Sequence, residues 1–322
     1  MIDFYIHQQK YSIPNAWNEL TPALFEGIMV DARKVSLGVI PPAMVGVNHV
    51  CRSMEWRLEK IVESKDEVML ANLSWLSEQV NFVFTISYPD NDAVLQDLSK
   101  EDYQKAKRTP PERLKLPIAR FLKKLDYKFT LNSCFSAQLV PFVHLKNKIY
   151  FGYKIDTGYD RLTCSLTALQ FIEARNLNND DNVKLPLLAA ILYHPGAYNS
   201  QSAHVLARDF ECLPADILQN IAFNFTSFVN FLFSRTDFKL LIEGEDEEKS
   251  AISTGPLESL YNLSSDGYGD VSSVEQMNII QYLTILRKKL IETVRSMNYA
   301  EMETVDIAKK TGLPISLIKQ II

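Results

Sequence analysis

Apolar side chains recur every three or four residues along most of the chain, which is the spacing of one face of an α-helix. A first helix is predicted after Thr21 and Pro22, because Thr is a favoured N-cap residue and Pro fits the first helical turn. The same spacing predicts further helices over residues 41–64, 66–88, 162–175, 183–193, 202–211, 214–234 and 274–296, with two short helices closing the chain.

Two segments show an alternating pattern instead, which indicates β-hairpins. The first is IDFYIHQQKYSI at residues 2–13, which ends at Pro14. The second lies within residues 127–155, where QLVPFVHL and KIYFGYKI flank the turn dipeptide Lys146-Asn147. We therefore predict a mainly α fold with small β-hairpin elements (α+β), multi-helical and ending in a helix-turn-helix-like pair.

The pattern Leu-Thr-x-x-x-Phe follows both hairpins, at residues 20–25 and 166–171. In each copy Thr is placed to cap a helix, Leu to pack just outside it, and Phe to fall onto the sheet. Each hairpin also has a His before its turn and a Lys and a Tyr after it: His7, Lys10 and Tyr11, then His144, Lys148 and Tyr150. A duplicated module and a chance match are both consistent with so short a pattern.

The order of these elements suggests five parts. We predict an N-terminal hairpin plus helices at 1–88, a polar and basic excursion at 89–126, and a hairpin plus helical core domain at 127–242. A mobile loop is expected at 243–273, because that stretch contains the acidic run EGEDEEK and the Ser/Gly-rich run SSDGYGDVSS. A C-terminal helical tail at 274–322 completes the chain.

Composition places the chain among ordinary globular proteins. Of its 322 residues 47% are hydrophobic, and 34 basic against 39 acidic side chains give a net charge of −5, which does not favour a general polyanion binder. The four cysteines, Cys51, Cys134, Cys164 and Cys212, are isolated, as is typical of buried thiols in a reducing compartment. The N-terminus does not resemble a signal peptide, and the most apolar stretch, 217–232, is interrupted by polar residues. We expect a cytoplasmic protein.

None of the sequence motifs that carry catalysis is recognisable. Only His49-x-Cys51 brings two soft metal ligands close together, whereas a metal site needs three or four. The one glycine-rich turn, Asp266–Asp270, carries aspartates that would repel a phosphate. We therefore predict no catalytic residue, no cofactor-binding residue, no metal ligand and no cofactor, and hence a protein that is not an enzyme.

The segment from Lys105 to Lys124 is strongly basic, with Glu112 as its lone acid. Such a patch can bind an acidic protein face even on an acidic molecule. The alternative is a solvated loop that leads into a helix with an apolar face, and a single-strand nucleic-acid binder would need more aromatic side chains than Phe121. The candidate partner-binding residues are Lys105, Lys107, Arg108, Arg113, Lys115, Arg120, Lys123 and Lys124.

The last residues of the chain fit a helix-turn-helix. Ala308, Gly312 and Ile318 have the spacing that such a pair needs for its close contact, its left-handed turn and its apolar anchor. If the pair binds DNA, the residues expected to contact nucleic acid are Lys309, Lys310, Ser316, Lys319 and Gln320. The second helix is mostly apolar, however, which favours packing on its own domain or on a protein partner, so nucleic acid is not the expected ligand.

Three stretches carry a family resemblance. They are KYSIPNAWNELTPALF near the start, LTALQFIEARNLNNDDNVKLPLLAAILYHPGAY with FECLPADILQNIAFNFTSFVNFLF in the middle, and GPLESLYNLSSDGYGDVSSVEQMNIIQYL later. These stretches, about half of the chain, resemble tail-assembly or tail-associated proteins from phages and prophages of Bacteroidetes-type hosts.

The resemblance implies a non-enzymatic phage tail-assembly or virion-associated structural or chaperone protein that acts through protein–protein contacts. Its partners would be phage structural proteins, the tail tube or the tape measure, in the host cell cytoplasm during assembly or in the virion. The alternative function is a DNA-associated regulator that uses the C-terminal helix pair.

Overall fold

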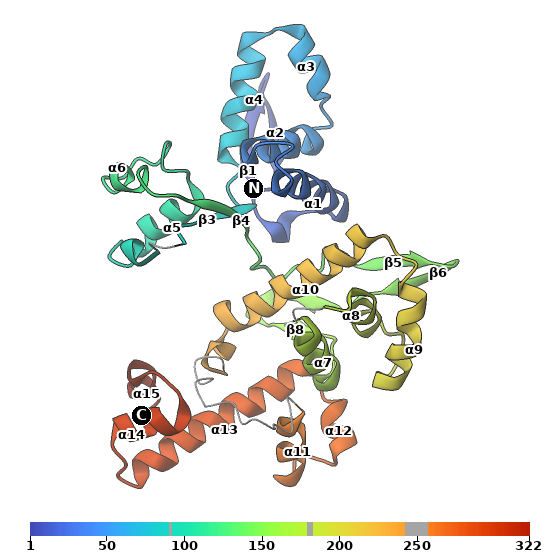
Figure 1. Cartoon of the computed structure of the whole chain (residues 1–322), viewed down its shortest axis with the longest axis vertical. Helices are drawn as coiled ribbons and strands as arrows, with labels where there is room; N and C mark the ends of the chain where they lie inside the picture. The colour runs from blue at the N-terminus through green and yellow to red at the C-terminus, as the bar shows by residue number, and fades with distance from the viewer. Residues whose placement is uncertain (90–91, 179–182, 242–256) are drawn as a thin grey trace. The chain divides into compact units, whose positions relative to one another are not determined.

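The computed structural model describes residues 1–89, 92–178, 183–241 and 257–322 (Figure 1). The chain divides into two compact units, Met1–Asn132 and Ser133–Ile322. Both are mainly α-helical with two-stranded antiparallel sheets, which confirms the predicted fold class. No helix among the described residues has the length and hydrophobicity needed to cross a bilayer.

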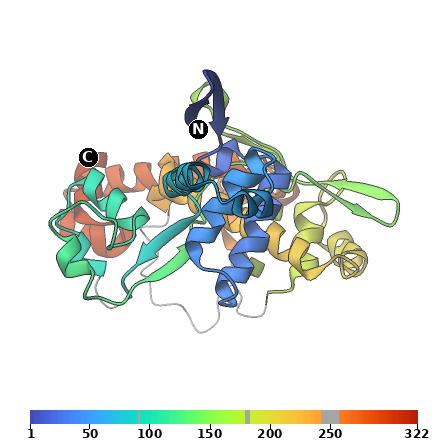
Figure 2. The ribbon, with the colours of Figure 1, turned by 90° about the horizontal axis from the view of Figure 1, so that it is seen from above.

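The N-terminal unit begins with a hairpin and continues with helices and a second strand pair. Its strands and helices are β1 (Ile2–Ile6), β2 (Gln9–Ile13), α1 (Pro22–Ser36), α2 (Pro42–Ser53), α3 (Leu58–Ser64), α4 (Glu67–Gln79), β3 (Phe84–Ser87), α5 (Lys100–Arg108), α6 (Ala119–Leu122) and β4 (Lys128–Leu131), with short 3₁₀ turns η1 (Trp17–Glu19) and η2 (Asp92–Leu95). The β1–β2 hairpin projects from the helices of this unit (Figure 2).

Two of the helix predictions for this unit are wrong in part. The helix expected over 41–64 is broken into α2 and α3, because Glu55 adopts a left-handed conformation with φ of 56°. The helix expected over 66–88 ends at Gln79, and its last residues form strand β3 instead. By its spacing alone, the apolar run from Phe82 to Ile86 fits a helix or a strand. It forms a strand because it pairs with β4.

The basic segment belongs to a small lobe with its own core. Strands β3 and β4 pair antiparallel, and α5 and α6 pack against them. Ile86, Leu95, Ala106 and Leu122 are fully or almost fully buried there. The basic side chains are therefore held on an ordered surface, and the loop of the alternative interpretation lies between α5 and α6, at residues 109–118.

The C-terminal unit has fifteen described elements besides its loops. They are β5 (Phe142–Leu145), β6 (Lys148–Phe151), β7 (Ile155–Asp156), η3 (Gly158–Asp160), β8 (Thr163–Cys164), α7 (Ala168–Asn178), α8 (Leu185–Leu192), α9 (Ser200–Phe210), α10 (Ala215–Arg235), η4 (Asp237–Leu241), α11 (Glu258–Ser265), α12 (Val271–Glu275), α13 (Ile279–Tyr299), α14 (Thr304–Thr311) and α15 (Ile315–Ile321). Helices α7, α8 and α10 enclose its main core, with Phe171, Phe225 and Phe228 buried at the centre.

The two Leu-Thr-x-x-x-Phe segments do fold alike locally. The Oγ1 of Thr21 accepts a hydrogen bond from Leu24 N, and the Oγ1 of Thr167 accepts one from Gln170 N, so both threonines cap their helices. Phe25 and Phe171 are 1% and 2% exposed. Both hairpins turn through two residues with positive φ, His7-Gln8 and Lys146-Asn147, the geometry of a type I′ turn.

Part of the expected mobile loop is helical. The acidic run at 243–249 lies outside the described residues, but 257–273 contains α11 and the start of α12. Leu260, Leu263 and Val274 are completely buried, and this packing overrides the Ser- and Gly-rich composition. The helix predicted to start at 274 begins at Ile279, where Asn278 caps it by accepting from Ile280 N.

The closing helix pair forms as predicted. Gly312 takes the left-handed conformation, with φ of 67°, between α14 and α15. Ile307, Leu313 and Ile318 are buried beside Val294 of α13. The apolar face of the second helix is thus used for packing within this unit, as the sequence favoured.

Candidate partner-binding groove

Two adjoining hollows in the N-terminal unit form an open apolar groove. Their volumes are about 510 and 630 Å³. Pro41, Pro42 and Phe129 line both, so the two hollows are continuous along the start of α2 and strand β4. We call the combined feature the groove.

One wall of the groove is the connection between α1 and α2. Helix α1 ends at Ser36, and the positive φ of Gly38 just beyond it lets the N–H groups of Gly38 and Val39 bond back to the carbonyls of Val35 and Lys34. This turn leaves two apolar side chains in solvent: Leu37 is 77% exposed and Val39 is 66% exposed. Large apolar side chains beside a hollow are typical of surfaces that bind another molecule.

The opposite wall combines α4 with β3 and β4. Phe84 and Phe129 meet edge to face with their ring centroids 6.0 Å apart, and both line the groove. Helices α2 and α4 approach closely at Gly46, where a Cβ atom would lie 2.7 Å from the carbonyl oxygen of Ser77. Gly46 therefore allows these two helices, both of which line the groove, to approach this closely.

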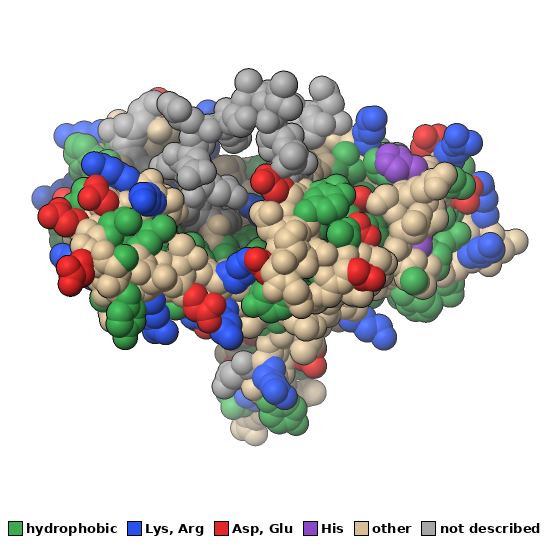
Figure 3. All heavy atoms as spheres, turned by 90° about the horizontal axis from the view of Figure 1, so that it is seen from below, with side chains coloured by type: hydrophobic (Ala, Val, Ile, Leu, Met, Phe, Trp, Pro, Cys, Tyr) green, Lys and Arg blue, Asp and Glu red, His purple; other side chains and the backbone are tan. Residues whose placement is uncertain are grey.

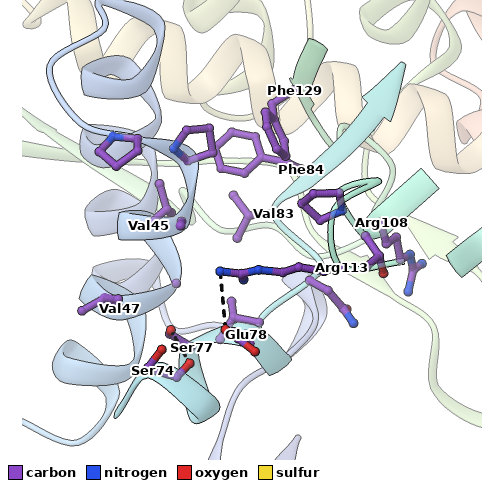
Figure 4. Close-up of a pocket in the computed structure, with 18 of the residues that line it drawn as sticks. Val45, Val47, Ser74, Ser77, Glu78, Val83, Phe84, Arg108, Arg113 and Phe129 are labelled. Carbon is purple, nitrogen blue, oxygen red and sulfur yellow. Dashed lines mark hydrogen bonds and ion pairs between the residues drawn. The ribbon is translucent and has the colours of Figure 1, made fainter. Parts of the chain in front are cut away.

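Charged side chains line the side of the groove next to α5. Arg113 extends across it, and its Nη2 lies 3.4 Å from Oε1 of Glu78 (Figure 4). Arg108 is exposed beside it, and Glu112 accepts a hydrogen bond from the hydroxyl of Tyr127. Burial, and after it the bond to Glu112, raises the pKa of Tyr127. The described residues lining the groove include no His or Cys.

The eight basic residues predicted from sequence are divided between the groove and the outer surface of the lobe. Arg108 and Arg113 line the groove. Lys105 is paired with Glu101 at 2.7 Å, a contact that raises the pKa of the lysine, and Lys107 lies over the ring of Tyr103. The other four, Lys115, Arg120, Lys123 and Lys124, are exposed outside the groove.

The lobe as a whole keeps a clear positive surplus. Residues 84–131, from β3 to β4, contain ten Lys or Arg and seven Asp or Glu, a surplus of three in a chain whose net charge is −5. The lobe therefore attracts an acidic partner even though the whole molecule is acidic.

The five candidate nucleic-acid contacts are exposed on α14, α15 and their connection. They are Lys309, Lys310, Ser316, Lys319 and Gln320. Lys309 is within 3.8 Å of Asp306, and residues 301–322 contain three acidic and three basic side chains. Figure 3 shows positive and negative side chains interspersed on the face of the C-terminal unit that it presents. A neutral helix pair gains little from a phosphate backbone.

His49 and Cys51 do not form a site. The ring of His49 is fully buried, and its Nε2 donates to the carbonyl oxygen of Pro14 at 2.7 Å. Burial lowers the pKa of His49 and raises that of Cys51. The described residues contain no group of three or more His, Cys, Asp or Glu side chains placed to hold a metal ion.

The apolar half of the groove was not recognised in the sequence. Its residues come from three separate segments, 35–47, 74–84 and 108–129, and only the fold brings them together. The one local signal is the run Leu37-Gly38-Val39-Ile40-Pro41-Pro42, whose apolar residues follow the end of a predicted helix. Comparison with protein-family models, with curated proteins and with solved structures finds no match.

Proposed function

We propose that this chain is a non-enzymatic assembly protein that binds a protein partner in the groove of its N-terminal unit. The observation that carries the proposal is the combination of an open apolar groove with a basic lobe beside it. Apolar contact supplies affinity and charge supplies orientation, which is how protein interfaces divide these tasks.

The exposed apolar side chains give the groove the means to bind. Burying a side chain such as that of Val39, which lines the groove, contributes about 1.5–3 kcal/mol when burial is complete. The ion pair between Arg113 and Glu78 opposes binding little, because its side chains are 52% and 42% exposed and such surface pairs are worth about 1 kcal/mol or less. Breaking this ion pair therefore costs little, and Arg113 can turn from Glu78 to a carboxylate of the partner.

The resemblance to phage tail-assembly proteins supplies the identity of the partner in this proposal. The groove would hold a tail-tube or tape-measure protein during assembly in the host cell cytoplasm, and the chain would act as a chaperone or stay in the virion. The residues that would take part are Arg108 and Arg113 inside the groove and the exposed basic residues around it.

Site-specific photo-crosslinking tests this function. A benzoylphenylalanine residue is placed at Val39 in the groove and, as a control, at Tyr299, which is 90% exposed on the C-terminal unit. Both variants are expressed in cells producing the phage, irradiated, and analysed by mass spectrometry. We expect a cross-link from position 39 to a tail-tube or tape-measure protein, and none from position 299. Equal products at both positions, or no tail protein at position 39, would contradict the proposal.

The alternative is a DNA-associated regulator, and the formation of the helix pair around Gly312 is the observation that favours it. Lys309→Glu with Lys310→Glu changes the charge of this pair by −4 without touching a buried residue. Salt-dependent binding to duplex DNA that is lost in the double variant would support the regulator. Absence of binding by the unmodified chain at low salt would exclude it.

A further inference from the structure

Strand β4 has an open edge, and its first two residues, Lys128 and Phe129, line the groove. In the β3–β4 pair, Asn132 N donates to Val83 O, and Phe84 pairs with Leu131 and Ile86 with Phe129. Hydrogen-bonded and non-hydrogen-bonded pairs alternate in an antiparallel ladder. The residues opposite Phe84 and Ile86 are therefore non-hydrogen-bonded positions, and the N–H and C=O groups of Phe129 and Leu131 point away from β3.

These outward groups meet no described backbone partner. The backbone hydrogen bonds of the described residues outside the helices and strands include none from Phe129 or Leu131. The hollow of about 630 Å³ lies between this strand and residues 35–42, so there is space beside the edge. An unpaired strand edge next to a hollow is a template for an added strand.

We propose that the occupant of the groove is an extended, acidic segment of the partner protein that adds to β4 as a third antiparallel or parallel strand. This inference rests on the proposed function and specifies its binding mode. Alternate side chains of the added strand point to opposite faces. One set falls on the apolar face that carries Phe84 and Phe129, and the other stays in solvent with Lys128 and Thr130.

The positive charge of the lobe favours an acidic partner in the groove over a second copy of this chain. Lys128 lies on the edge itself, and Arg108 and Arg113 lie in the groove. Pairing β4 with β4 of a second copy would bring together two lobes that each carry a surplus of three positive charges. An acidic segment neutralises these charges, whereas a second copy doubles them.

A defined peptide probe tests the binding mode. The probe is an eight-residue peptide of alternating valine and glutamate with blocked ends, compared with its valine–lysine counterpart and with a version N-methylated at alternate amides. Binding to the full chain is followed by fluorescence polarisation at low salt, and by hydrogen exchange of the Phe129 and Leu131 amides. We expect the glutamate peptide to bind and to slow exchange at both amides, and the lysine peptide not to bind.

If the peptide pairs with β4 through its backbone, binding should weaken when backbone N–H groups of either strand are removed. N-methylation in the register that faces β4 is expected to weaken binding about tenfold or more, because it removes several main-chain hydrogen bonds. Leu131→Pro removes an outward donor without removing a ladder bond of β3–β4, and is expected to weaken binding about fivefold. Thr130→Ser is the matched control, because it keeps the edge and the hydroxyl that hydrogen-bonds to Thr85 across the ladder. Far-ultraviolet circular dichroism and melting of each variant verify that it folds.

Charge variants complete the test. Arg108→Glu is expected to weaken the glutamate peptide about tenfold, whereas Lys124→Glu, an exposed lysine outside the groove, is expected to have a smaller effect. Equal binding of the N-methylated peptide, or no binding of any peptide, would overturn strand addition while leaving the cross-link at Val39 to decide the proposed function. A dimer in sedimentation that is lost in Leu131→Pro would assign the edge to a second copy and would also overturn the inference.

Discussion

Arg52 Nη1 lies 2.6 Å from Oδ2 of Asp31, and this ion pair joins α2 to α1 at a point where Asp31 is completely buried. Asn48 Nδ2 donates to the same oxygen at 3.0 Å. A buried carboxylate is tolerated only when it is paired and hydrogen-bonded. The pair therefore fixes the mutual position of the two helices whose connection forms one wall of the groove.

Replacement of the arginine should destabilise the N-terminal unit strongly. Arg52→Met leaves the carboxylate of Asp31 buried without its cation, and we expect a loss of about 3 kcal/mol, the lower end for a broken buried pair, because the Arg52 side chain is 35% exposed. Urea unfolding measures the change. Lys60→Met, at an exposed position of α3, is the control and should alter stability by less than about 0.5 kcal/mol. Equal stability of the two variants would show that the pair does not hold the helices.

Gly27 should respond to substitution in a way that depends on Arg52. A Cβ atom at Gly27 would lie 2.9 Å from Cδ and Nε of Arg52, so the glycine leaves room for the arginine to reach Asp31. Gly27→Ala should therefore destabilise the chain, although alanine is favoured over glycine inside a helix by about 0.5–1 kcal/mol. In an Arg52→Met background the steric cost is smaller and the substitution should become neutral or stabilising. A double-mutant cycle by urea unfolding measures this coupling, and additive effects would contradict it.

The stability of the N-terminal unit should fall below neutral pH through His49. Burial lowers the pKa of this imidazole from its usual value near 6.5, against the bond to Pro14, which raises it. The unfolded chain then binds the proton more readily than the folded one. The stabilisation is complete above about pH 6.5 and is lost as the pH falls below that value. Unfolding free energies of the unmodified chain and His49→Gln between pH 7.5 and 5.5 test this point, and identical slopes would contradict it.

The four thiols should differ widely in reactivity. Cys212 is exposed and Cys134 is half-buried, which corrects the expectation of four buried thiols, whereas Cys51 and Cys164 are buried. Burial raises the pKa of Cys164 to about 12, so little thiolate is present at pH 8. With iodoacetamide we expect Cys212 to react first, Cys134 more slowly, and Cys51 and Cys164 only after unfolding. Peptide mapping by mass spectrometry reads the order, and early modification of Cys164 would show that its site opens in the native state.

Local patterns in the sequence predicted the elements that local chemistry determines. The hairpins, the caps at Thr21 and Thr167 and the turn at Gly312 depend on neighbouring residues, and all of them form. The strand β3 was predicted as helix because its partner, β4, lies about forty residues later and no local pattern shows the pairing. The groove was missed for the same reason: Pro41, Phe84 and Phe129 become neighbours only in the folded unit.

The turn at Gly312 allows a graded test of the closing helix pair. Its φ of 67° lies in the left-handed region, which costs a residue with a Cβ atom about 1–2 kcal/mol and asparagine less. The next residue, Leu313, is 1% exposed, so the chain must turn here for that side chain to reach Ile307 and Ile318 in the core. Gly312→Val should therefore destabilise this part of the chain more than Gly312→Ala, and Gly312→Asn should destabilise it least. Hydrogen exchange of the α14 and α15 amides reads the local stability. Equal protection in the three variants would mean that the helix pair does not depend on the left-handed turn.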